Sequence, residues 1–75
     1  MDIKIIELAA KVMKVPVEEA AKHNKLLPDI DAFYFWNPVR GGISVIINSS
    51  GEKLGAGSSV SFEKHLKAFL DGKRN

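Results

Sequence analysis

The fold prediction starts from residues 32–40, which read Ala-Phe-Tyr-Phe-Trp-Asn-Pro-Val-Arg. This run holds four of the six aromatic side chains of the chain. Successive side chains of an extended strand point to opposite faces, so Phe33 and Phe35 share one face while Tyr34 and Trp36 share the other. The residues alone leave open which pair points into the core. The pattern predicts a strand that is covered on both of its faces.

The chain has 75 residues and no cysteine. A chain of this length forms one domain, which buries only about 60% of the surface of its unfolded state. Without cysteine there is no disulfide, no thiolate nucleophile and no zinc site built on sulfur. The net charge is +2 with the two signs interspersed, which gives no strong long-range attraction to nucleic acid.

Targeting and membrane segments are not predicted. Every uncharged run is far shorter than the roughly 17 residues that a membrane helix requires. Asp2, Lys4 and Glu7 interrupt the first apolar segment, where a signal peptide would have an unbroken apolar core. We therefore expect a cytoplasmic protein without a membrane partner.

Residues 1–27 are predicted to form a helical part. Apolar residues recur at helical spacing over residues 2–14, with Asp2 placed as an N-cap. Pro16 ends this helix and suits the first turn of a second, short helix over residues 16–24. Residues 26–31 are interpreted as a connector.

Residues 32–59 are predicted to form a β-meander of three strands. The first covers residues 32–40, the second residues 43–48 and the third residues 52–58. Residues 48–51, Asn-Ser-Ser-Gly, are typical of the turn between the last two strands. Ser61 is predicted to cap a closing helix over residues 61–71, which Gly72 ends. The fold class is therefore a single small α+β domain: helix, short helix, three-stranded antiparallel sheet, C-terminal helix.

Two helices of this size are expected to cover one face of the sheet well, which leaves aromatic rings on the other. Tyr and Trp are frequent anchors of protein interfaces. We therefore predict a partner-binding surface formed by Tyr34, Trp36, Asn37 and Arg40, with Pro38 shaping the end of the strand. The partner is expected to be another protein or a second copy of the chain. Burial of all the rings in a filled α+β core is the alternative.

The second half also resembles a known family. The runs 42–54, Gly-Ile-Ser-Val-Ile-Ile-Asn-Ser-Ser-Gly-Glu-Lys-Leu, and 57–66, Gly-Ser-Ser-Val-Ser-Phe-Glu-Lys-His-Leu, are similar to the end of small bacterial domains of the YrhB type. That family includes proposed immunity proteins for polymorphic toxins, and the resemblance covers about residues 33–70. It implies a non-enzymatic protein that works by binding another protein, in an immunity-like or chaperone-like role. The chain departs from the pattern at Asn48, where the family has an acid, and around Lys64 and His65.

Nucleic-acid binding is the alternative function. Residues 10–20 match the hydrophobic skeleton of a helix-turn-helix, but the second helix begins with Glu18 and Glu19, which would repel phosphate. The aromatic strand could instead stack bases on Tyr34 and Trp36 while Arg40 meets phosphate.

Catalytic residues are sparse. His23 and His65 would form a site only if the fold joined them to a carboxylate. Asp29, Asp31 and Glu52 lack the spacing of a calcium loop, and residues 55–59 lack the ending of a phosphate loop. We predict no catalytic residue, cofactor or metal, and hence a protein that is not an enzyme.

Overall fold

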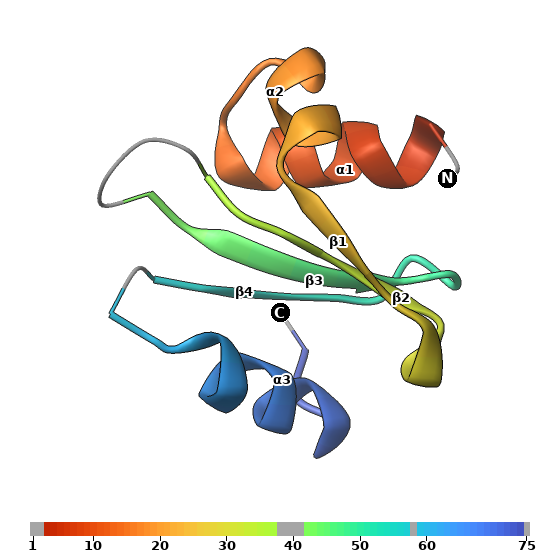
Figure 1. The fold of residues 1–75 in the computed structure, drawn as a ribbon, viewed down its shortest axis with the longest axis vertical. Coiled ribbons are helices and arrows are strands. Elements are labelled where there is room, and N and C mark those ends of the chain that lie inside the picture. Colours follow the sequence, from red (N-terminus) through yellow and green to blue (C-terminus); the bar gives the residue numbers. More distant parts are fainter. Residues whose placement is uncertain (1–2, 38–41, 58, 75) are drawn as a thin grey trace.

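The computed structural model describes residues 3–37, 42–57 and 59–74. Two helices, α1 (Ile3–Met13) and α2 (Val17–Lys22), come first. They are followed by β1 (Asn24–Leu27), a short 3₁₀ helix η1 (Pro28–Ile30), three further strands and a last helix: β2 (Ala32–Phe35), β3 (Ser44–Asn48), β4 (Lys53–Ala56) and α3 (Phe62–Leu70). The predicted α+β class is confirmed (Figure 1).

The sheet has four strands rather than the three predicted. Its strands follow chain order, β1-β2-β3-β4, and each neighbouring pair is antiparallel. The additional strand, β1, takes in residues from the end of the predicted second helix and from the predicted connector. The boundary of a helical part at residue 27 is therefore wrong, because residues 24–27 pair with β2.

Helix α1 ends in a turn that the backbone closes by itself. The Val15 N–H donates to the Ala10 carbonyl at 3.0 Å, and the Lys14 N–H donates to the Lys11 carbonyl at 3.3 Å. This pair of hydrogen bonds is the Schellman motif, in which Lys14 takes the left-handed position with φ of 59°. The break before Pro16 is thus confirmed, while the predicted N-cap Asp2 lies outside the described residues.

The turn and the helix cap predicted in the second half form as expected. Asn48 Oδ1 accepts from the N–H groups of Ser50 (3.0 Å) and Glu52 (2.9 Å), and Gly51 has a φ of +88°. Ser61 Oγ accepts from the Lys64 N–H at 3.3 Å, which caps α3. Gly72, with φ of +94°, follows the end of the same helix.

The helices lie on opposite faces of the sheet. Figure 1 shows α1 and α2 on one side of the strands and α3 on the other. The expectation that the helices cover one face together is therefore wrong. Each face has its own apolar cluster, one joining α1 and α2 to Phe35, Val45 and Ile47, and the other joining α3 to Ala32 and Ile46.

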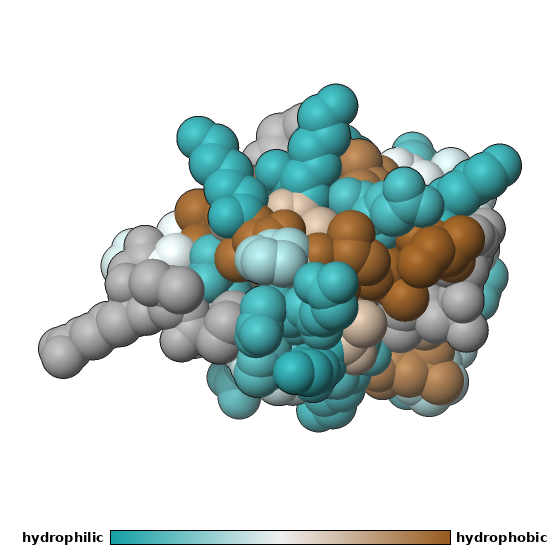
Figure 2. All heavy atoms as spheres, turned by 90° about the horizontal axis from the view of Figure 1, so that it is seen from above, coloured by the Kyte–Doolittle hydropathy of each residue, from teal (hydrophilic) through white to brown (hydrophobic). Residues whose placement is uncertain are grey.

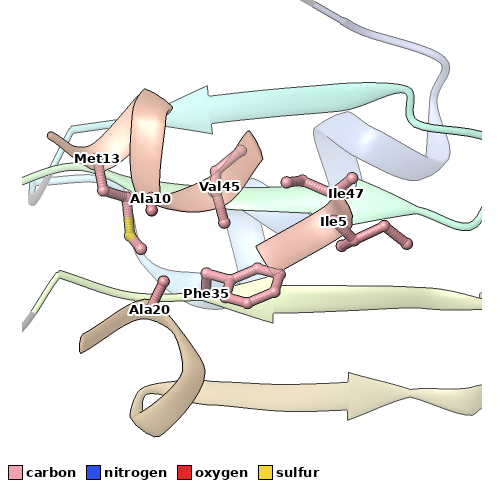
Figure 3. Close-up of a cluster of buried hydrophobic side chains, with 8 residues drawn as sticks. Ile5, Ala10, Met13, Ala20, Phe35, Val45 and Ile47 are labelled. Atoms are coloured by element: carbon pink, nitrogen blue, oxygen red, sulfur yellow. The ribbon is translucent and has the colours of Figure 1, made fainter. Parts of the chain in front are cut away.

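This arrangement decides how the aromatic strand is used. Phe35 is fully buried among Ala10, Met13 and Ala20 on the α1 side (Figure 3). Phe33 packs against the same cluster, and Tyr34 packs against the cluster on the α3 side. Small side chains on α1 allow the helix to approach the sheet closely, so a large ring from β2 fills the space between them.

Candidate functional site

Five ring side chains gather on the α3 side of the sheet, near the start of α3. We call them the aromatic cluster, and its members are His23, Tyr34, Trp36, Phe62 and His65. Tyr34 lies at its centre: its ring centroid is 4.7 Å from that of Phe62 and 5.9 Å from those of Trp36 and His65. The ring of His23 lies 5.9 Å from Trp36. The cluster therefore joins β2, the residue before β1 and the first turn of α3.

Tyr34, a predicted partner-binding residue, is half-buried inside this cluster. Its hydroxyl donates to Ser44 Oγ on the neighbouring strand at 3.2 Å. The ring meets Phe62 edge to face, with 68° between the planes. The side chain of Tyr34 is thus held against α3. Its ring supports Trp36 and does not form a separate exposed contact.

Trp36 is the most exposed member of the cluster, with 36% of its surface exposed. Its ring stacks on Tyr34 with 29° between the planes and tilts at 59° against His23. Its backbone N–H donates to the His23 carbonyl at 3.1 Å. Phe62 and His65 of α3 contact Tyr34, whereas the ring partners of Trp36 are Tyr34 and His23. The result is an exposed indole fixed by ring contacts and by its backbone.

Asn37 and Arg40 are the other two predicted partner-binding residues. Asn37 Nδ2 donates to the Met13 carbonyl at 3.1 Å, which ties the strand end to the end of α1. The same side chain lies against Gly42, where an added Cβ would come within 2.4 Å of Asn37 Cγ. Asn37 therefore has a packing role. Arg40 and Pro38 lie outside the described residues.

Lys25 contributes a cation to this surface that the sequence analysis did not anticipate. Its Nζ lies 5.4 Å from the centre of the Phe62 ring, in the geometry of a cation–π contact. Lys25 pairs with Tyr34 across the two strands and therefore shares its face. No sequence pattern pointed to this position, because β1 itself was not predicted.

The two histidines occupy different environments within the cluster. His65 is only 2% exposed, and its Nε2 lies 2.6 Å from the Leu54 carbonyl, so this nitrogen carries the proton and donates. His23 Nε2 lies 3.2 Å from Glu19 Oε2 on α2. His65 thus links α3 to β4, and His23 links the end of α2 to Trp36.

The acidic side chains do not come together as a metal site. Asp31 Oδ2 accepts from Ser49 Oγ, and Glu52 Oε1 accepts from Asn48 Nδ2 at 2.9 Å. Among the described residues, no group of three or more His, Cys, Asp or Glu could hold a metal ion. Asp31 and Glu52 both stabilise the ends of strands.

The helix-turn-helix skeleton packs, but its second helix is short. Ala10 and Ala20 are both buried in the cluster between α1 and the sheet. Helix α2 has only six residues, and Glu18 on it is exposed. Two residues after α2 ends, the chain enters β1. A six-residue helix with acidic side chains in its first turn presents little that could read a DNA groove.

In the described parts of the chain, no helix is long and apolar enough to cross a membrane. Compared with protein-family models, with curated proteins and with solved structures, the chain matches none of them. The function therefore has to be argued from the geometry of the aromatic cluster and its surroundings.

Proposed function

We propose that the chain is a small, non-enzymatic binding module that recognises another protein, with Trp36 as the main contact residue. One observation carries the proposal: an indole with 36% of its surface exposed is held by ring contacts on two sides and by a backbone hydrogen bond. Tryptophan is among the residues whose truncation most weakens protein interfaces. A side chain that is already fixed loses little conformational entropy when a partner covers it.

The surroundings of Trp36 favour a protein partner. The ring lies between those of Tyr34 and His23, and Tyr34 in turn packs against Phe62, so an apolar side chain placed over Trp36 would meet further ring surface. Lys25 at the side of the cluster supplies a cation that can meet an acidic residue of the partner. An immunity-like role, in which that partner is a toxin, agrees with the resemblance to YrhB-type domains.

Trp36 is the single tryptophan of the chain, which makes it a direct reporter of binding. We expect a candidate partner to shift the fluorescence of the unmodified protein to shorter wavelength, because the partner would remove water from the indole. The candidate partners are the proteins that the tagged chain captures from a nuclease-treated lysate. Candidates that bind with full affinity but leave the emission spectrum unchanged would show that Trp36 is not the contact.

A Trp36→Ala variant tests the same point by affinity. Val17→Ala is the matched control, because Val17 is 38% exposed and lies on α2, on the other side of the sheet. We expect Trp36→Ala to weaken capture at least tenfold and Val17→Ala to leave it unchanged. Thermal unfolding of both variants shows whether the fold is kept, and the fluorescence measurement on the unmodified chain stays informative if the first variant unfolds.

Single-stranded nucleic acid is the second candidate, because Lys25 lies on the same face as the exposed ring of Trp36. The two candidates differ in their response to salt. Binding through phosphates falls steeply between low and physiological salt, whereas binding through an apolar contact around Trp36 changes little. A steep salt dependence together with loss of the captured material on nuclease treatment would favour nucleic acid.

A further inference from the structure

The strand β1 forms one edge of the sheet. Antiparallel ladders alternate between residues that bond to the neighbouring strand and residues that face away from it. The His23 carbonyl accepts from the Trp36 N–H, so every second residue after His23 bonds to β2. Asn24 and Leu26 are the residues between, and they direct their backbone N–H and C=O groups outward. In the described part of the chain, no strand pairs with this outer side.

Apolar surface accompanies this edge on both faces of the sheet. Leu26 is 53% exposed and pairs with Phe33, so its side chain points to the α1 side. Figure 2 looks onto that side and shows hydrophobic surface between projecting hydrophilic side chains. On the α3 side, a groove of about 260 Å³ lies between β1, η1 and α3. Its apolar lining residues include Leu27, Ile30, Leu66 and Leu70. A strand added to β1 would cover apolar surface with the side chains of both its faces.

Lys25 places a positive charge at one defined position of this edge. It is exposed, and it pairs with Tyr34 and so points to the α3 side. The residue of an added strand that stands opposite Lys25 would point to the same side. Opposite charges in such a cross-strand pair are favourable, and like charges are unfavourable. Asp29, which also lines the groove, lies on η1, beyond the last residue of β1. The strand that fits therefore carries Asp or Glu opposite Lys25.

The strand β1 of a second copy fits this edge poorly. Antiparallel pairing centred on Leu26 would place Pro28 of the copy, which has no N–H, at a bonding position opposite Asn24. Pairing centred on Lys25 would place two lysines directly opposite each other. Proline and lysine at an edge commonly prevent pairing between identical strands. Neither residue hinders a strand from another protein, because the groups that would bond to it belong to Asn24 and Leu26.

We propose that an extended segment of another protein adds to β1 as a fifth, antiparallel strand, with an acidic residue opposite Lys25 and an apolar residue opposite Leu27. The apolar side chain enters the groove, and in the segment it stands two positions before the acid. Each neighbouring pair of strands in the sheet is already antiparallel. Because only two residues of β1 offer outward groups, the segment by itself binds weakly. The inference does not rest on the function proposed for Trp36.

Nuclear magnetic resonance on the isotope-labelled chain tests the proposal with the synthetic peptide Thr-Val-Leu-Val-Glu-Val-Thr. Its Leu would stand opposite Leu27 and its Glu opposite Lys25. We expect the amide protons of Asn24 and Leu26 to shift to low field and to exchange at least tenfold more slowly, because they gain acceptors.

Three outcomes would overturn the proposal. The first is a peptide that does not bind at millimolar concentration. The second is a peptide that shifts the resonances of Leu66 and Leu70 but does not protect the amides of Asn24 and Leu26, since it would occupy the groove without pairing. The third is protection of these amides by a rise in protein concentration alone, which would identify a second copy as the occupant.

Matched peptides test the pairing and the charge separately. N-methylation of the Val opposite Leu26 removes a donor that faces β1, whereas N-methylation of the Glu removes one that faces away. We expect the first to weaken binding at least tenfold and the second to leave it nearly unchanged; equal weakening would contradict strand addition. Replacing the Glu by Lys should weaken binding to the unmodified chain and strengthen it to Lys25→Glu. Equal binding of the two peptides to the unmodified chain would contradict the acidic residue.

Discussion

Phe35 offers a direct test of the layer formed by α1 and the sheet. Its ring is fully buried against α1, α2 and β3, and no rearrangement of the surface can fill the space that Phe35→Ala would leave. Burial of such a ring contributes about 1.5–3 kcal/mol by transfer from water, and the cavity raises the cost of Phe→Ala to about 3–5 kcal/mol. A domain of 75 residues has a free energy of unfolding of about 4–11 kcal/mol. The substitution should therefore remove a large share of the stability or unfold the protein.

Urea unfolding followed by circular dichroism measures this loss. Leu70→Ala is a suitable control, since Leu70 is 57% exposed and lies on α3, on the other side of the sheet. We expect the control to change the free energy of unfolding by less than about 1 kcal/mol. A loss below about 1 kcal/mol for Phe35→Ala would refute the placement of this ring between the helix and the sheet.

Three further substitutions test local features of the second half. Asn48→Ala removes two hydrogen bonds to backbone N–H groups and one to Glu52, so we expect a loss of about 1–2 kcal/mol in the free energy of unfolding, measured in urea. Ser61→Ala removes the cap of α3 and should cost about 1 kcal/mol in the same assay; an unchanged midpoint would mean that the cap contributes nothing. Gly72→Ala should lower the melting temperature through about 1 kcal/mol of backbone strain, because φ is +94° while the space around an added Cβ is open.

The sequence predicted those elements whose signals are local. The break at Pro16 depends on the proline itself and on backbone hydrogen bonds beside it. The turn at residues 48–51 and the cap at Ser61 depend on side chains within a few positions of the backbone groups that they satisfy. Each of these is found in the structure. Helical and alternating patterns likewise placed α1, α3, β3 and β4 close to their observed bounds, whereas β2 ends at Phe35 and does not include residues 36–37 of the strand predicted over residues 32–40.

The strand β1 could not be predicted in this way. Its four residues follow Lys22 and His23, which are typical of a helix end, and precede Pro28, which is typical of a connector. Nothing in Asn24-Lys25-Leu26-Leu27 favours a strand strongly. These residues are extended because the open edge of β2 supplies partners for their backbone groups, and that edge exists only in the folded chain.

The candidate site likewise combines features that the sequence predicts with features that only the folded chain shows. The run of rings at residues 33–36 was evident from the sequence, as was the alternation of its two faces. The sequence by itself thus determined the fold class, the local turns and the presence of surplus rings on β2. Only the tertiary structure decided that α3 packs on the face opposite α1, which partly buries Tyr34, leaves part of Trp36 exposed and brings Lys25 beside Phe62. The physical reason is that an amphipathic helix specifies which of its sides is buried, whereas the face of the sheet that it covers depends on contacts between residues far apart in the chain.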